Sequence, residues 1–263
     1  MPSDRTLEVV SRKRLYAAGE QAWELLQYGV PLNIDEWDDH FKGDQMRYDA
    51  TAPGTYQSTA SGAAAAVAAI SAGLVGGQIV LDPGTDDGGR SDLSLGLHYT
   101  GSRFAVCAHR FRTGDAITSQ KFELGFTDVV SGTDAGAVNV KATPTFRASD
   151  AAVLVYDTND DALLTLVGVL AGTAATAYDF ATVLANNTFY TGIVALRGTR
   201  AAGYLLDADG NVLERQPTSG YMESAVTAAT LLTPWAFVQN RTASNHRLFI
   251  DRLKVYQMAT AAS

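Results

Sequence analysis

Two carboxylates in the segment 119–128 are the residues of this chain whose type and spacing first suggest chemistry. Glu123 lies in a run of alternating apolar and polar residues, and Asp128 follows that run. Hydrolysis of a glycosidic bond requires two opposed carboxyl groups, one as the acid and one as the nucleophile or base. However, Gly125 stands between them, and side chains five positions apart on a regular strand point to opposite faces. We therefore predict no catalytic residues and no enzymatic activity.

Two acidic loops contain enough oxygen ligands to suggest calcium. The run Asp207–Asn211 has oxygen ligands at alternate positions, but Thr218 stands where an EF-hand loop needs its glutamate. An Asp-Gly pair between two apolar runs is better explained as a hairpin turn. The second loop is interpreted as a solvated turn, and it holds Asp82, Asp86 and Asp87.

Other reactive side chains are isolated in the sequence. Cys107 is the single cysteine, so no intrachain disulfide can form, and its apolar neighbours predict a buried, unreactive thiol. There is no phosphate-binding loop, dinucleotide fingerprint or nucleophile elbow. We expect His98 and His109 to be ordinary strand residues. The histidines lack the spacing of a metal site, so neither a metal nor a cofactor is expected; they are His40, His98, His109 and His246.

Aromatic side chains on a sheet surface could stack on a sugar ring. Trp37, Tyr99 and Tyr204 are the candidates for glycan contact. Aromatic residues pack into a sheet face more often than they form a stacking platform, and both alternatives stay open for these three. Trp235 lies in a strongly apolar run and is expected in the core.

Composition and charge limit the classes of partner. The 263 residues include 46% hydrophobic and 18% charged residues, which is typical of a folded globular protein large enough for one big domain. The net charge of −8 argues against nucleic-acid binding, which needs clustered Lys and Arg. We recognise no signal peptide and no apolar run long enough to cross a membrane. We therefore expect synthesis in a reducing cytoplasm.

Short β-branched and aromatic runs separated by Gly, Asp, Asn and Pro dominate the chain after Pro31. Around a dozen strands at roughly ten-residue spacing are typical of a sandwich or barrel. We therefore predict an all-β antiparallel sandwich. The predicted strands are 63–70, 75–81, 92–99, 103–111, 119–126, 136–142, 151–157, 163–169, 189–197, 201–206, 230–239 and 246–257.

The N-terminal segment has a different pattern. Residues 5–28 contain no Pro, and their apolar residues recur at helical spacing until Gly29 and Pro31 end the pattern. We divide the chain into a helical arm, residues 1–34, and a β domain, residues 35–263. The apolar stripe of the arm must be buried on the domain itself or on a neighbouring protein. The residues proposed for arm contacts are Arg12, Lys13, Arg14, Trp23, Leu25 and Leu26.

Six strand motifs follow one another over about residues 35–258: Asp38–Asp44, Ser94–Tyr99, Lys121–Asp128, Ala152–Thr158, Leu232–Gln239 and Leu248–Gln257. In this order they resemble the large concanavalin A-like (laminin G-like) jelly rolls encoded in tailed bacteriophage genomes. In the glucanase branch of that fold the strand equivalent to 119–126 carries three carboxylates. Glu123 and Asp128 match the outer two, and Gly125 replaces the middle one.

The resemblance implies a virion structural protein. Head decoration protein, head fibre and minor tail protein are the roles it suggests, each acting through assembly contacts with other capsid or tail proteins. The segregated arm and the Ala-rich strands suggest a homo-oligomer, with a trimer as one option. A basic triplet on the arm is either a solvated helix face or a contact for an acidic surface of another virion protein. The alternative function is a carbohydrate-binding module that attaches the virion to a host glycan.

Overall fold

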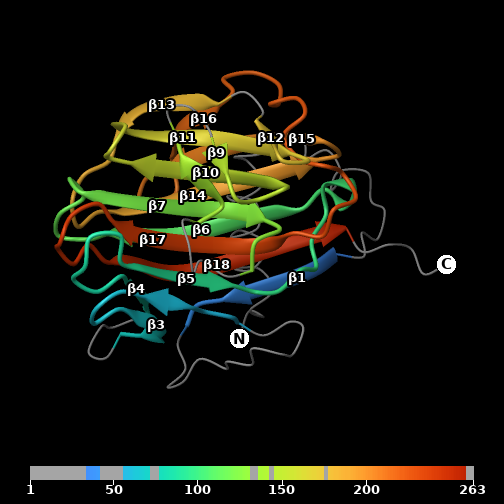
Figure 1. Cartoon of the computed structure of the whole chain (residues 1–263). Coiled ribbons are helices and arrows are strands. Elements are labelled where there is room, and N and C mark those ends of the chain that lie inside the picture. The colour runs from blue at the N-terminus through green and yellow to red at the C-terminus, as the bar shows by residue number, and fades with distance from the viewer. Residues whose placement is uncertain are drawn as a thin grey trace, which may run out of the picture.

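The computed structural model describes residues 34–41, 56–71, 77–130, 136–141, 145–174 and 177–258. Two antiparallel sheets stack face to face in this part of the chain, which confirms the predicted jelly-roll sandwich (Figure 1). Within these residues the single helical element is a 3-10 turn, η1 (Gly101–Arg103). The arm helix predicted over residues 5–28 lies outside the described residues and stays a prediction.

The first sheet has eight strands, and the first and last described strands, β1 (Ile34–Asp39) and β18 (Leu248–Met258), pair with each other in it. Strand β18 also pairs with β6 on its other side and with β4 at its beginning. The order across this sheet is β16 (Val212–Gln216), β15 (Arg200–Leu206), β14 (Phe189–Arg197), β6 (Val106–Thr113), β18 (Leu248–Met258), β4 (Ile79–Asp82) and β3 (Ala66–Ile70), with β1 (Ile34–Asp39) added beside β18.

The second sheet also has eight strands, and β7 (Gln120–Thr127) lies at its centre between β10 (Ala151–Asp157) and β17 (Thr233–Asn240). A separate two-stranded hairpin, formed by β8 (Val138–Val140) and β9 (Thr145–Phe146), belongs to neither sheet. The order across the second sheet is β12 (Thr173–Ala174), β11 (Asp161–Leu170), β10 (Ala151–Asp157), β7 (Gln120–Thr127), β17 (Thr233–Asn240), β5 (Arg90–Ser94) and β2 (Ala60–Ser61), with β13 (Tyr178–Val183) added beside β11.

The core lies between the two sheets and is built from the alternation visible in the sequence. Phe122 and Phe126 on β7 point into it, and Phe122 lies 5.6 Å from Phe111 of the first sheet, measured between ring centroids. Phe122 also stacks on Tyr156 of β10 at 5.1 Å. Each large apolar side chain buried in this way stabilises the fold by roughly 1.5–3 kcal/mol, so the shared core determines how the sheets pack.

At one edge of the sandwich a carboxylate links the two sheets. Strand β13, at the margin of the second sheet, lies beside β16 of the first sheet. The Glu214 side chain accepts hydrogen bonds from the backbone N–H groups of Ala181 and Thr182 at 2.8 and 2.9 Å. It also accepts one from the Thr182 hydroxyl at 3.0 Å. The carboxylate thus satisfies amides that an edge strand would otherwise expose.

All twelve predicted strands overlap strands of the structure, although several boundaries differ. The segment predicted as 92–99 is strand only at β5, since residues 95–98 belong to no strand and Tyr99 forms only an isolated bridge with Leu232. Strand β6 begins three residues later than predicted because η1 precedes it. The pattern did not predict β13, because Phe180 is its single buried side chain. The turn at Asp207 is a hairpin between β15 and β16, as predicted, and the Asp207 carboxylate accepts hydrogen bonds from the N–H groups of Asp209 and Asn211.

Candidate functional site

The face of the second sheet that points away from the core is the place to look for the chemistry suggested by Glu123. Phe122 and Leu124 point inward, so Lys121 and Glu123 on the same strand point outward. Trp235 and Phe237 on neighbouring β17 share that outward face, and their rings stack at 5.9 Å. The segment around the β8–β9 hairpin covers this face.

The Glu123 carboxylate is fully buried and saturated with hydrogen-bond donors. It accepts bonds from the backbone N–H groups of Ala137 and Val138 at 2.7 and 3.0 Å. A third bond, at 2.9 Å, comes from the Trp235 indole nitrogen. Two of these donors belong to the segment that leads into the β8–β9 hairpin. Because this segment occupies the space next to the carboxylate, Glu123 has no contact with solvent.

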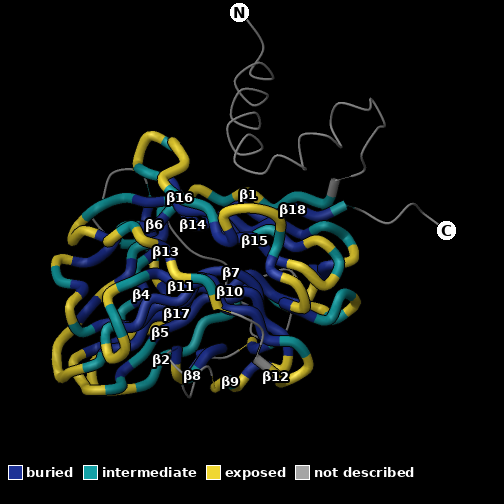
Figure 2. The backbone as a smooth tube through the Cα atoms, turned by 90° about the horizontal axis from the view of Figure 1, so that it is seen from above, coloured by how far each residue is buried: buried dark blue, intermediate teal, exposed yellow. Residues whose placement is uncertain are grey.

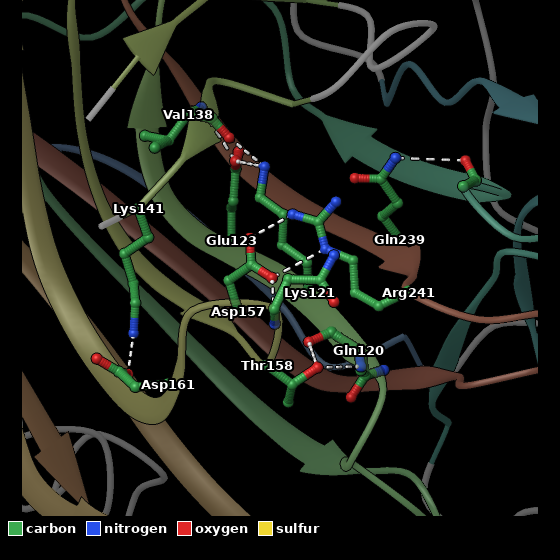
Figure 3. Close-up of polar contacts among 12 residues, drawn as sticks. Gln120, Lys121, Glu123, Val138, Lys141, Asp157, Thr158, Asp161, Gln239 and Arg241 are labelled. Atoms are coloured by element: carbon green, nitrogen blue, oxygen red, sulfur yellow. Dashed lines mark hydrogen bonds and ion pairs between the residues drawn. The ribbon is translucent and has the colours of Figure 1, made fainter. Parts of the chain in front are cut away.

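Lys121 supplies the charge that balances Glu123. Its Nζ lies 2.9 Å from Glu123 Oε1, and neither side chain is exposed (Figure 3). Nζ also donates a hydrogen bond to the Val138 carbonyl and lies 5.3 Å from the centroid of the Phe237 ring. Burial lowers the pKa of Lys121, against the opposing effect of Glu123. The pair therefore fastens the hairpin to the sheet through charge-assisted hydrogen bonds.

A second hydrophobic cluster seals the hairpin against the outward face. Gly136, at φ +83°, allows the close approach, because a Cβ there would lie 2.7 Å from Glu123 Oε1. The cluster joins hairpin residues to side chains from β10, β11 and β17, and Phe146 packs against it. Its members are Val129, Ala137, Val138, Ala148, Ala151, Val153, Val155, Val167, Val169, Trp235 and Phe237.

Gly125 cannot be replaced by the missing middle carboxylate. Its φ of +149° is unfavourable for side-chain-bearing residues. A Cβ at this position would lie 2.4 Å from the Ala152 carbonyl oxygen and 3.0 Å from the Val153 Cα. The glycine is therefore needed where the backbone of β10 approaches β7.

Asp128 does not form a pair with Glu123. It lies just beyond the end of β7, and its carboxylate accepts a hydrogen bond from the Ser149 N–H at 3.1 Å. Partial burial raises the pKa of Asp128.

A second ion pair joins Asp157 of β10 to Arg241, with 2.8 Å between Asp157 Oδ1 and Arg241 Nε (Figure 3). In the described part of the chain, the carboxylates of Glu123, Asp128 and Asp157 thus each have their own separate partners on or beside the covered face.

The three aromatic candidates for glycan contact are not brought together on a surface. Tyr99 is 4% exposed and belongs to the core between the sheets, where its ring centroid lies 6.0 Å from that of Phe126. Burial raises its pKa. Tyr204 is also 4% exposed but lies on the outward face of the first sheet. Trp37 is half-buried and donates a hydrogen bond from Nε1 to the Tyr56 hydroxyl at 2.9 Å.

Two histidines show contrasting environments. His98 was predicted to be a strand residue, which is wrong, because it follows β5 in a loop and its Nε2 lies 2.5 Å from Asp35 Oδ2 at the surface. His109 is a strand residue of β6, as predicted, and desolvation lowers its pKa to about 3. Cys107 lies on the same side of β6, and burial raises the pKa of its thiol well above the usual value, as expected for an unreactive cysteine.

No cluster of three or more His, Cys, Asp or Glu side chains that could hold a metal occurs within the described ranges. No helix in the same residues is long and apolar enough to cross a membrane. The proposed arm contacts lie outside the described residues: Arg12, Lys13, Arg14, Trp23, Leu25 and Leu26.

Sequence reasoning found Glu123 but missed its partners. The alternation of β7 places Lys121 and Glu123 on one face, and that signal was available. The hydrogen bond from Trp235 was not available, since 112 positions separate the two residues in the chain. The role of Ala137 and Val138 depends on their backbone N–H groups, which carry no side-chain signature.

Comparisons with known proteins show a shared fold. No family model matches the chain, and no curated protein matches it. Among solved structures, the carbohydrate recognition domain of Emp47p superposes with a TM-score of 0.52 at 12% identity, covering 85% of this chain and 95% of that one. The CBM2 module of the evolved Dit of Lactobacillus casei BL23 phage J-1 gives 0.50 at 13% identity, covering 89% and 100%.

An enzyme has the same architecture. The non-specific endo-β-1,3(4)-glucanase SCLam, of family GH16, superposes with a TM-score of 0.51 at 11% identity, covering 88% of this chain and 94% of that one. At such low identity these likenesses concern the path of the backbone and not the chemistry. The chain therefore has the concanavalin A-like jelly-roll fold that lectin domains, a phage carbohydrate-binding module and a glucanase share.

Proposed function

We propose that this chain is a non-enzymatic structural protein of a tailed-phage virion. It would act through assembly contacts with capsid or tail proteins, as head decoration, head fibre or minor tail component. In this proposal the arm, residues 1–34, contributes the contacts of Arg12, Lys13, Arg14, Trp23, Leu25 and Leu26. The domain, residues 35–263, is the rigid body that the arm positions.

The covered outward face of the second sheet is the observation that carries this proposal. Glu123 occupies the strand position where the glucanase branch has a catalytic acid, but its oxygens are held by Ala137, Val138 and Trp235. Lys121 neutralises it in the same buried space. An ion pair and a hydrophobic cluster fill the outward face of the second sheet. A domain built in this way is suited to binding other proteins through its outer surface. The similarity in fold to the CBM2 module of a phage Dit also supports a role in a phage particle.

Mass spectrometry of purified phage particles tests the virion role. We expect the chain at a fixed copy number per particle, and immunogold labelling then assigns it to head or tail. Its absence from particles that package DNA normally, together with its presence in the infected cell, would reject the virion role.

A hydrolysis assay tests the absence of catalysis separately. We expect neither the native protein nor the Glu123→Gln variant to release reducing sugar from a mixed-linkage β-glucan. The folded state of both proteins is checked by circular dichroism. Release by the native protein that the variant loses would overturn the non-enzymatic assignment.

Carbohydrate binding for host attachment is the second candidate function. The likeness to carbohydrate recognition domains and to the phage CBM2 module favours it. Of the three aromatic candidates, Trp37 retains partial exposure, whereas Tyr99 and Tyr204 are buried. A glycan array with the native protein and a Trp37→Ala variant tests this function. Binding that the substitution weakens would support it, and an array without any binding would remove it.

Self-association is part of the structural proposal. We expect a homo-oligomer, with a trimer as one option, because a virion component acts in repeated copies. Native mass spectrometry and light scattering over a range of concentrations measure the state directly. A monomer at every concentration and in the particle would contradict it.

A further inference from the structure

A row of four side chains crosses neighbouring strands on the outward face of the first sheet. Arg112 of β6 lies directly opposite Phe189 of β14 on one side and Phe249 of β18 on the other. Val80 of β4 lies opposite Phe249 and extends the row. We call these four residues the Arg112 row. The row points away from the core, because the adjacent residue on each strand belongs to the core; these core residues are Leu81, Phe111, Tyr190 and Ile250.

The Arg112 row is accessible from outside the chain. Its four side chains are all half-buried, and none is fully enclosed. Ala69 of β3 lies opposite Val80 and is exposed, and Val67 on the same strand is 46% exposed. Figure 2 shows β14 and β18 on the side of the molecule opposite to the β8–β9 hairpin, which packs on the second sheet. The row and β3 thus form an open apolar strip with one cation in it.

Two phenyl rings and an amide hold the guanidinium group of Arg112. Its Cζ lies 3.9 Å from the centroid of the Phe249 ring and 6.0 Å from that of the Phe189 ring. Its Nη1 donates a hydrogen bond to the side-chain oxygen of Asn187. These contacts fix the plane of the guanidinium before any ligand arrives, so less side-chain entropy is lost on binding. The N–H groups that remain can pair with a planar carboxylate.

Arg112 differs from the other cations of this face, which all have carboxylate partners. In the described ranges no carboxylate pairs with Arg112, although the chain carries a net charge of −8. A cation held between apolar rings and left without a counter-charge is complementary to a carboxylate of another molecule. The paired cations on β6, on β18 and just before β18 are Arg110 with Asp251, Arg247 with Asp82, Arg252 with Asp38, and Lys254 with Glu36.

The surroundings of Arg112 favour a protein over a sugar as the source of this carboxylate. Arginine and aromatic side chains are enriched at the centres of protein–protein interfaces. A sugar that stacks on an aromatic residue needs an open ring face. Here Arg110 lies over the Phe189 ring at 4.4 Å, and Arg112 lies over the Phe249 ring. A second copy bound through the same row is disfavoured, because a two-fold contact would bring two Arg112 side chains together.

We propose that the Arg112 row is a docking site for an acidic segment of another protein. An Asp or Glu carboxylate of that segment binds the Arg112 guanidinium, and apolar side chains beside it cover Phe249 and Val80. The site lies on the domain and not on the arm, so it adds a second contact to the proposed assembly role. It does not depend on that role, because it is a property of the isolated protein.

A titration followed by nuclear magnetic resonance tests the proposal on the full-length protein. The probes are N-acetyl-Leu-Glu-Leu amide and the neutral N-acetyl-Leu-Gln-Leu amide. We expect the Glu peptide to shift the Arg112 Nε–H signal and the amides of Phe189 and Phe249, and the Gln peptide to bind at least about fivefold more weakly. Equal affinity of the two peptides would overturn the proposal. Absence of shifts at Arg112 with about 10 mM Glu peptide would also overturn it.

Substitution of Arg112 separates charge from geometry. Arg112→Gln should abolish the preference for the Glu peptide, and Arg112→Lys should weaken it, because lysine keeps the charge without the planar fork. Arg247→Gln is the matched control, since it removes an exposed arginine that is already paired with Asp82, and it should bind like the native protein. Amides of β7 report whether each variant is folded. A preference for the Glu peptide that persists in Arg112→Gln would contradict the proposal.

Acidic sugars are the competing class of ligand. Glucuronic acid and sialic acid, titrated in the same way, should bind more weakly than the Glu peptide. Tighter binding of either sugar would reject the assignment to a protein partner. Absence of the chain from phage particles would leave these titrations unchanged, and failure of the peptide to bind would leave the arm contacts of the virion role untouched, so the two proposals fail separately.

Discussion

Lys121 Nζ and Glu123 Oε1 lie 2.9 Å apart in a part of the second sheet that solvent does not reach. The two residues are on the same face of one strand and share Val138 as a hydrogen-bond partner. Lys121 donates to the Val138 carbonyl, and Glu123 accepts from the Val138 N–H. Glu123 is therefore part of a buried ion pair that holds the β8–β9 hairpin on the sheet. The carboxylate stays buried only while this hairpin remains packed against β7.

Breaking this pair should destabilise the protein strongly. Lys121→Met removes the cation and leaves the Glu123 carboxylate buried without a counter-charge, which costs about 3–5 kcal/mol in comparable cases. Urea unfolding measures the loss. Arg200→Met is the control, because it breaks a surface pair with Glu223 at 3.4 Å and should cost less than about 1 kcal/mol. Similar losses in both variants would show that Lys121 has no special role.

Gly125 provides a second test of how tightly the central strands approach. Gly125→Ala places a methyl group against the Ala152 carbonyl oxygen and should destabilise the protein by about 3 kcal/mol or prevent folding. Gly198→Ala also has a positive φ, but no atom lies within 4 Å of its Cβ position, so only about 1 kcal/mol of backbone strain is expected. Comparison of their unfolding midpoints separates steric overlap from strain. Equal midpoints would contradict the close approach of β10.

Glu214 should protect an exposed strand edge. Glu214→Ala leaves the N–H groups of Ala181 and Thr182 without their acceptor, at a cost of about 1–3 kcal/mol. An exposed edge also promotes pairing with other molecules, so light scattering should show faster aggregation on heating. The variant Glu223→Ala removes an exposed carboxylate without backbone partners among the described residues and should behave like the native protein. Slow aggregation of the Glu214 variant would exclude the protective role.

His109 should make the stability of the folded protein decrease in mildly acidic solution. Its folded pKa of about 3 lies below the ordinary value of 6.5, so the unfolded chain binds a proton that the folded chain does not. Stability is therefore complete above pH 6.5 and falls as the pH is lowered toward 3, by at most about 1.4 kcal/mol per pH unit. Urea unfolding of a His109→Gln variant between pH 7 and 4 should show a shallower slope. His40→Asn, which alters a surface histidine, should retain the native slope.

The sequence by itself determined the class of the fold. Phe122, Leu124 and Phe126 alternate with polar residues, and this period of two predicts a strand with its apolar face in the core. That the polar face of β7 is buried as well did not follow from the pattern. The Asp-Gly turn after Leu206 and the burial of Cys107 also followed from local pattern, because turn chemistry and apolar runs depend on neighbouring residues. Strand β13 did not follow from pattern, because Phe180 is its single buried side chain.

Tertiary structure alone decided what the candidate site does. The Glu123 carboxylate could be read from the chain, but its donors come from 14 and 15 positions away and, in the case of Trp235, from 112 positions away. No local pattern specifies which loop will lie on a sheet face, because that choice depends on the volume and charge of everything packed there. Glu123 is enclosed because Gly136 lets the backbone approach and Lys121 supplies the opposite charge, and both conditions exist only once the sheets have formed.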